Sequence, residues 1–103
     1  MKLIKELEEM IEDEVHDIKH YAKKAIELKV VHPSLAQVLY TISTQEDSHQ
    51  AMIHAEVVKL IEEYRRLHGN PPEAMMANYE YIHERHIEKL EEARRYQEMY
   101  KKS

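Results

Sequence analysis

Apolar residues recur at steps of three and four along most of the chain, which is the spacing of one face of an α-helix. The first such segment runs from Lys2 to about Val30, and the second runs from Ser34 to His68. The first stripe comprises Leu3, Leu7, Met10, Ile11, Glu14, Ile18, Tyr21, Ala25 and Leu28. The second comprises Leu35, Val38, Leu39, Ile42, Glu46, His49, Ile53, Val57, Leu60 and Tyr64. The pattern predicts two long helices whose apolar faces are interrupted by polar residues.

A short turn joins these two helices. Residues before a proline are disfavoured in the α region, so Pro33 predicts that the first helix ends near Val30. Ser34 followed by Gln37 is a capping-box pattern, and it predicts the start of the second helix. Because the connection is short, we expect the two helices to be antiparallel neighbours.

A second turn follows at Gly69, a typical residue after a helix end, and Asn70 before two prolines predicts the N-cap of a third helix. We therefore predict one all-α domain over residues 1–103. It contains a hairpin over 1–68 and a third helix over 70–101.

Composition agrees with long helices and restricts the partners. Charged residues make up 34% of the chain, and it has one Gly, no Phe, no Trp and no Cys. Any metal must therefore be held by carboxylates and imidazoles. The net charge of −5 argues against nucleic acid as a partner. No run of 18 apolar residues and no signal-peptide pattern is present, so we expect a cytoplasmic protein with no membrane partner.

Three polar residues stand where the stripes require hydrophobic ones: Glu14, Glu46 and His49. A carboxylate or imidazole on a buried face is destabilising unless it is satisfied. Glu46 and His49 lie one turn apart on one helix face. Counted from the turn at ~1.5 Å per residue, Glu14 lies at nearly the same height on the facing helix. The three residues are therefore predicted to bind a metal ion.

Three ligands leave such a site open, and narrow apolar stripes leave the core of one chain small. We therefore expect a homo-oligomer, a dimer or larger. A two-fold axis beside the hairpin would join two hairpins into a four-helix bundle, with six ligands around two ions. Oxygen-rich ligation with one imidazole per ion suits iron or Mn²⁺, and Zn²⁺ also fits.

A second Glu-x-x-His pair occurs at Glu80 and His83. Counted from the second turn, its height differs from that of His49 by about 13 Å, so we interpret it as a solvated or packing pair. A surface zinc site at His83 and His86 is a weaker alternative. Core packing is the default expectation for Tyr21, Tyr40 and Tyr64.

The stretch Glu14-(x6)-Tyr21-Ala22-Lys23-Lys24-Ala25, followed by Pro33-Ser34-Leu35-Ala36 and Glu46-x-x-His49, resembles the first half of a rubrerythrin or ferritin-like bundle. The resemblance covers roughly residues 10–65. Those proteins usually carry the motif twice in one chain, whereas this chain carries it once. It is therefore more similar to half-size ferritins such as encapsulated ferritins, whose di-iron site forms between protomers.

The resemblance implies that Glu14, Glu46 and His49 bind iron and that the protein is a ferroxidase, an oxidoreductase in which O₂ oxidises Fe²⁺. The role would be iron handling or protection against oxidative stress. It also implies that Tyr21 takes part in catalysis from a position next to the metal ligands, without binding the ions itself.

Encapsulated ferritins also have acidic and aromatic residues beside the ligand on the first helix. Asp13, His16 and His20 stand there in this chain, so a secondary site for incoming metal is expected in altered form. The chain ends in Tyr100-Lys101-Lys102-Ser103 and not in an apolar cargo tail, so packaging in a shell is not supported.

Two other classes of function remain open. The polar triad could fix helix register in a non-catalytic helical oligomer or adaptor. It could also bind metal in a buffer or sensor without oxidase activity. The acidic run of Glu6, Glu8, Glu9, Glu12 and Asp13 is either a solvated face that complements the helix dipole or a funnel that concentrates cations.

Overall fold

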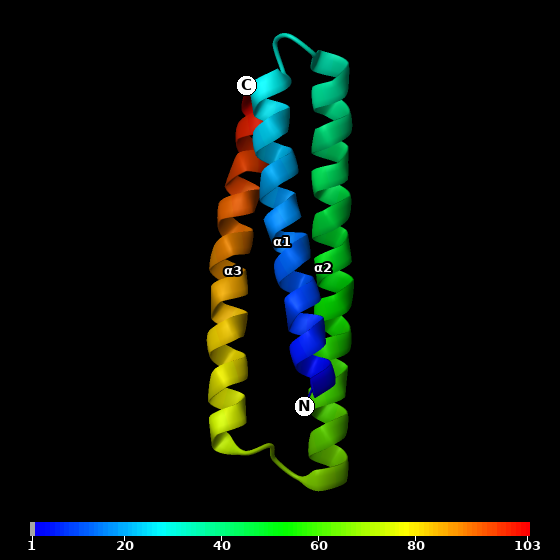
Figure 1. The fold of residues 1–103 in the computed structure, drawn as a ribbon, viewed down its shortest axis with the longest axis vertical. Coiled ribbons are helices and arrows are strands. Elements are labelled where there is room, and N and C mark those ends of the chain that lie inside the picture. The colour runs from blue at the N-terminus through cyan, green and yellow to red at the C-terminus, as the bar shows by residue number, and fades with distance from the viewer. Residues whose placement is uncertain (1) are drawn as a thin grey trace.

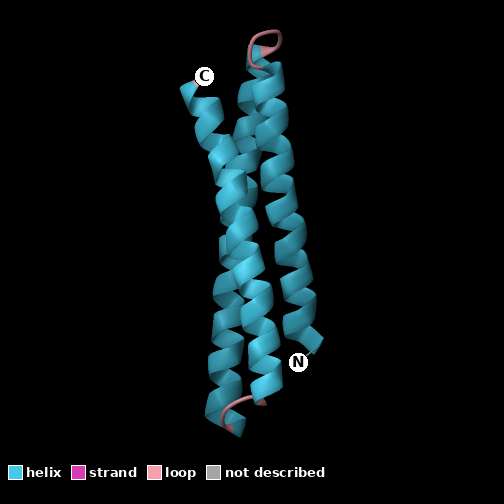
Figure 2. Cartoon of the chain, turned by 90° about the vertical axis from the view of Figure 1, so that its left-hand side faces the viewer, coloured by secondary structure: helices cyan, strands magenta, loops and turns pink. Residues whose placement is uncertain are grey.

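The computed structural model describes residues 2–103, and it contains three long helices (Figure 1). They are α1 (Lys2–Leu28), α2 (Pro33–His68) and α3 (Glu73–Lys102). α1 lies between the other two and packs against both, whereas α2 and α3 make few direct contacts. The two turns lie at opposite ends of the rod, which measures 56 × 19 × 18 Å (Figure 2). The predicted all-α fold with three helices is therefore confirmed.

The turns lie where the sequence places them, but the predicted caps are wrong. α2 begins at Pro33 with His32 as N-cap, so Ser34 is already inside the helix. α3 begins after Pro72, and Asn70 is not its cap. α2 starts at a proline, whose fixed φ suits the first helical turn, and α3 starts directly after one; neither N-cap makes a side-chain hydrogen bond. Gly69 ends α2 as predicted, with φ at 79° and its N–H donating to the Arg65 carbonyl at 2.9 Å.

Buried positions in all three helices repeat every seven residues, the spacing of helices that coil around one another. On α1 two such series are Glu8, Val15, Ala22 and Ile11, Ile18, Ala25. On α2 the series is Ala36, Ser43, Gln50, Val57, and on α3 it is His86, Ala93, Tyr100. The side chains of Ile11, Val15, Ile18, Val57, Ile61 and Ala93 form the largest apolar cluster.

The face of α2 that packs inside the chain differs from the predicted stripe. Ala36 and Ser43 are fully buried, whereas Leu35 and Val38 are 48% and 52% exposed. The Ser43 hydroxyl donates to the Ile18 carbonyl of α1 at 2.7 Å, which allows the two helices to approach closely. Small residues thus face the interior here, and larger apolar residues of α2 remain on the surface.

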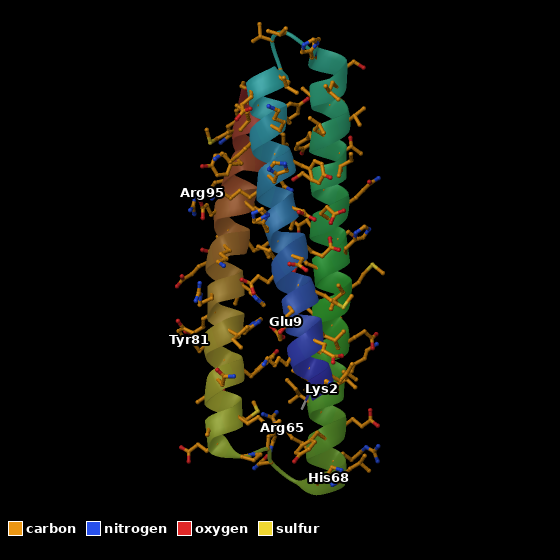
Figure 3. All side chains as sticks on the ribbon, viewed as in Figure 1. Lys2, Glu9, Arg65, His68, Tyr81 and Arg95 are labelled. Atoms are coloured by element: carbon orange, nitrogen blue, oxygen red, sulfur yellow. The ribbon has the colours of Figure 1, made fainter. Side chains whose placement is uncertain are left out.

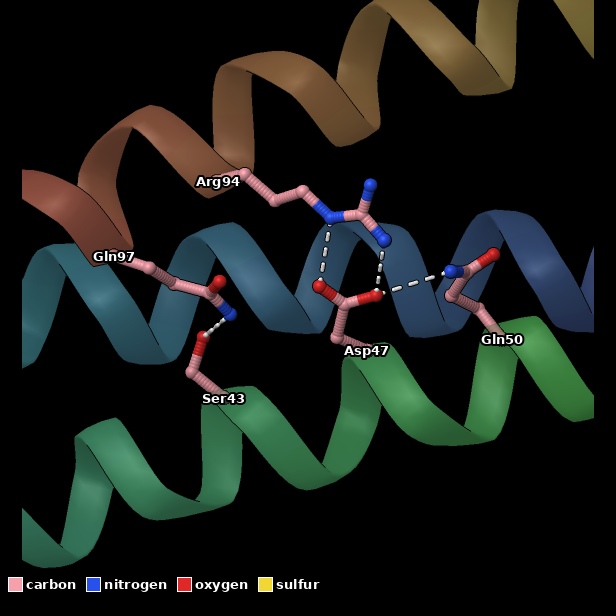
Figure 4. Close-up of polar contacts among 5 residues, drawn as sticks. All are labelled: Ser43, Asp47, Gln50, Arg94 and Gln97. Carbon is pink, nitrogen blue, oxygen red and sulfur yellow. Dashed lines mark hydrogen bonds and ion pairs between the residues drawn. The ribbon is translucent and has the colours of Figure 1, made fainter.

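Polar side chains join α2 to α3 across the bundle (Figure 4). Arg94 donates to both carboxylate oxygens of Asp47, at 2.8 and 2.9 Å, and Gln97 donates to the Ser43 hydroxyl at 3.0 Å. Gln50 also donates to Asp47 at 3.1 Å. The hydrogen bonds from the Arg94 guanidinium and from Gln50 hold the pKa of Asp47 below its usual range. These contacts fix the height of α3 against the hairpin.

Tyr81 and Arg95 project from the outer surface of α3 (Figure 3). Tyr81 is 59% exposed. Within residues 2–103, no helix combines the length and apolar character needed to cross a membrane.

The Arg94–Asp47 pair gives a prediction for stability. Arg94→Met should lower the free energy of unfolding by about 1 kcal/mol at pH 7, as measured by urea denaturation. Because the folded-state pKa of Asp47 is depressed, this contribution is present above 3.8, its ordinary pKa, and is lost as pH falls through the depressed value. Arg95→Met, on the exposed face of α3, is the matched control. An equal effect of both substitutions would contradict the role of the pair.

Candidate metal centre

Glu14 from α1 meets Glu46 and His49 from α2 in the middle of the hairpin. One ligand atom from each residue lies within 4.8 Å of the other two. Nδ1 of His49 is 3.7 Å from Oε2 of Glu14 and 3.7 Å from Oε1 of Glu46. This group of three residues, called the metal triad below, could hold a metal ion. The predicted agreement in height between the two helices is confirmed.

The heptad packing determines which way the triad faces. Asp47 accepts a hydrogen bond from Arg94 of α3, and Gln50 lines a cavity with residues of α3; these two residues are the sequence neighbours of Glu46 and His49. Successive residues on a helix are separated by about 100° around the axis, so Glu46 and His49 are turned away from α3. Glu14 precedes the buried Val15 and is likewise displaced from the three-helix core. The triad therefore lies on the side of the hairpin that α3 leaves uncovered.

Burial within the triad is uneven. The side chains of Glu14 and Glu46 are 26% and 19% exposed, whereas that of His49 is 52% exposed. Oε2 of Glu14 is buried and has no hydrogen-bond donor among the described residues. A buried oxygen of this kind is destabilising until a proton, a donor or a cation satisfies it.

The electrostatics of the triad also favour a cation. A proton shared with Glu46, followed by burial and by repulsion from the Glu46 carboxylate, raises the pKa of Glu14 to about 7. Near neutral pH the metal-free site therefore holds a proton that a metal ion would displace. Two carboxylates and one imidazole are ligands that suit iron, Mn²⁺ or Zn²⁺. The residues present thus fit a metal ion, with open positions on the side where His49 is exposed.

Tyr21 lies two turns beyond Glu14 on α1. It is half-buried, and its ring edge faces His20 at a centroid distance of 5.8 Å. Within residues 2–103, no hydrogen bond joins the Tyr21 hydroxyl to the triad. Its catalytic role stays a prediction.

Asp13, His16 and His20 lie on exposed parts of α1. The rings of His16 and His20 stack at 6.4 Å, and Asp13 and His16 line a pocket between α1 and α3. Asp13 and His16 therefore open toward α3, away from the triad. A secondary site for incoming metal at these residues stays a prediction.

On α3, Glu80 is exposed and His83 is half-buried, with its ring stacked between those of His54 and Tyr79. Glu80 is thus solvated and His83 is a packing residue, as expected. Tyr40 packs against the ring of Tyr100 at 4.6 Å.

One part of the acidic run is not solvated. Glu8 is 5% exposed and lies 3.1 Å from Nδ1 of His86 on α3. The expectation that this run is a solvated face is wrong for Glu8, because Glu8 belongs to the same seven-residue series as Val15 and Ala22. His86 shares such a series with Ala93 and Tyr100. This seven-residue spacing is the sequence signal that could have identified Glu8 and His86 as buried residues.

Comparison of the chain with protein-family models, with curated proteins and with solved structures finds no match. The case for a metal site therefore depends on the geometry and electrostatics of this chain alone.

The raised pKa of Glu14 gives a prediction for the metal-free protein. Between pH 4.5 and about 7 the folded chain binds a proton that the unfolded chain does not, so this contribution to stability is lost as pH rises through 7. Glu14→Gln removes this titration. In thermal unfolding with chelator, the melting temperature of the variant relative to that of the wild type should therefore rise by several °C between pH 5 and pH 8.

Glu9→Gln, at an exposed position of α1 (Figure 3), should follow the wild type across this range. If Glu14→Gln kept the pH dependence of the wild type, the raised pKa of Glu14 would not be its cause.

Proposed function

We propose that this protein is a di-iron carboxylate protein whose metal site forms between two copies of the chain, and that it oxidises Fe²⁺ with O₂. The observation that carries the proposal is the buried, donor-free oxygen of Glu14 between Glu46 and His49. A carboxylate in this setting is better satisfied by a cation than by the surrounding protein.

The open side of the triad supports a site shared between two chains. Three ligands do not complete the coordination of an iron ion, and His49 is half-exposed on the uncovered face of the hairpin. A second hairpin related by a two-fold axis would add its own Glu14, Glu46 and His49. The assembled site would then have four carboxylates and two imidazoles for two ions, which is the ligand set of di-iron bundles.

Exposed apolar residues on the same face support a partner of this kind. Met10 is one turn from Glu14 on α1 and is 51% exposed, and Met52 is one turn from His49 on α2 and is 65% exposed. Leu35 and Val38 extend the apolar surface toward the turn. Together these four residues are called the apolar face of the hairpin. Covering it with a second copy removes apolar area from water and completes a four-helix core, with α3 outside.

Fe²⁺ is the substrate in this proposal. Two Fe²⁺ ions held side by side give one electron each, and O₂ takes up these electrons with two protons to leave two Fe³⁺ and hydrogen peroxide. Glu14 and Glu46 hold the ions near each other and neutralise their charge. Carboxylates suit both oxidation states because they can bind one ion or bridge two.

Iron binding tests this proposal directly. The wild type should bind two Fe²⁺ per dimer in anaerobic dialysis and should oxidise them rapidly when mixed with aerated buffer, as followed by Fe³⁺ absorbance. Glu46→Gln should bind iron more than about tenfold more weakly, because it removes a charged ligand. Glu98→Gln is the control, since Glu98 is exposed on α3, outside the proposed shared site, and pairs with Lys101. Unchanged iron stoichiometry in Glu46→Gln would refute the assignment, and tight binding without oxidation would indicate a buffer or sensor.

The shared site makes a separate prediction about assembly. Val38→Lys places a charge on the apolar face at a position that is 52% exposed in the single chain, so the helices should fold normally. Sedimentation should show a dimer for the wild type and a monomer for Val38→Lys, which should also lose iron oxidation. Tyr81→Lys, on the outer side of α3, should remain dimeric. A wild-type monomer that oxidises iron would exclude the shared site.

A further inference from the structure

A second group of ionisable side chains lies inside the three-helix core, about 9 Å along α1 from the metal triad. Glu8 and His86 are 5% and 8% exposed and occupy heptad positions that elsewhere hold Val15, Ala22 and Ala93. A carboxylate and an imidazole in such positions are destabilising unless they are well satisfied. The sequence places them where a hydrophobic pair would have packed.

The contact between Glu8 and His86 is close but is not a hydrogen bond. Oε2 of Glu8 is 3.1 Å from Nδ1 of His86, yet both oxygens of Glu8 are buried without a correctly aligned donor among residues 2–103. Two ligands of one tetrahedral ion, each ~2.0–2.1 Å from it, lie about 3.4 Å apart and point at the ion instead of at each other. The short distance and poor alignment are therefore the arrangement expected of two ligands of a common ion.

Two further histidines lie beside this pair. His83 is one turn before His86 on α3, and His54 faces it from α2 with the rings parallel to within 8° and 4.7 Å apart. All three histidines line one cavity of about 340 Å³, together with Ile11, Gln50 and Leu90. The three helices of a single chain thus direct one carboxylate and three imidazoles to one region of the core.

The charge state of this region suits metal binding. Burial, followed by repulsion from His83, lowers the pKa of His54, whereas the Glu8 carboxylate opposes this shift. His54 is therefore neutral at physiological pH, and the neutral imidazole is the form that binds a metal. Among the described residues, Glu8 makes no ion pair with an arginine or lysine, and His86 is its one charged-type partner.

We propose that Glu8, His54, His83 and His86 bind a divalent transition-metal ion of the Zn²⁺ class within a single chain. Within residues 2–103, only the metal triad brings three ligand atoms within 4.8 Å of one another. Closure around an ion in the core therefore requires the half-buried rings of His54 and His83 to turn, and the cavity beside them provides the space. The site needs no second copy of the chain and does not depend on the proposed iron oxidation.

This core site can be tested in Glu46→Gln, where the metal triad lacks a ligand. Co²⁺ is the probe, because its visible absorbance becomes strong when it is four-coordinate with nitrogen and oxygen ligands. Titration of Glu46→Gln should show one Co²⁺ per chain with this spectrum, and Zn²⁺ should displace it. Adding His83→Gln should weaken Co²⁺ binding more than about tenfold. Adding Glu9→Gln, at an exposed position of α1, should leave binding unchanged.

Thermal unfolding gives a second readout that does not need a spectrum. Zn²⁺ should raise the melting temperature of Glu46→Gln and should have no effect on Glu46→Gln/His83→Gln. His83 is only half-buried, so this variant should fold where His86→Gln would leave Glu8 buried without a partner. The proposal is overturned if Glu46→Gln binds no Co²⁺, or if His83→Gln leaves the binding unchanged. Loss of iron oxidation in Glu46→Gln with Co²⁺ binding retained would separate the two sites.

Discussion

Two carboxylates, Glu14 on α1 and Glu46 on α2, are held against each other by helices that cannot separate without breaking the packing of the hairpin. A proton shared with Glu46, followed by burial and by repulsion between the two carboxylates, raises the pKa of Glu14 to about 7, and its Oε2 has no donor among the described residues. A proton relieves this conflict only in part. A divalent cation would satisfy both carboxylates and would take His49 as a further ligand, which is why a metal site accounts for the triad better than a structural polar network does.

The seven-residue repeat of buried positions determines where this conflict lies. It commits one face of α1 and α2 to α3 through residues such as Ser43, Asp47 and Gln50, and leaves the opposite face with the triad and the exposed Val38. One face of the hairpin packs against α3, whereas the other is not covered, and a second hairpin packed there would make a four-helix bundle. The repeat therefore accounts for the packing of the three helices, and it leaves free the face on which the assembly is proposed.

The helices and the triad could be predicted from the sequence because each depends on local signals. Pro33 and Gly69 mark the turns, and counting residues from the first turn brings Glu14 level with Glu46. The inward face of α2 could not be predicted, because apolar residues occur on both of its faces and contact with α3 decides between them. Glu8 was misassigned because its seven-residue spacing to Val15 and Ala22 was not read as a buried series, whereas its contact with His86 depends on the packing of α1 against α3 and could not be predicted.

Anomalous diffraction at the iron edge, from crystals grown with Fe²⁺ without O₂, tests the central claim most directly. The account predicts iron peaks bounded by Glu14, Glu46 and His49 from two copies of the chain, with the two ions ~3.5–4 Å apart. Iron found only elsewhere, or a Glu14 side chain turned into solvent in the assembled particle, would contradict it.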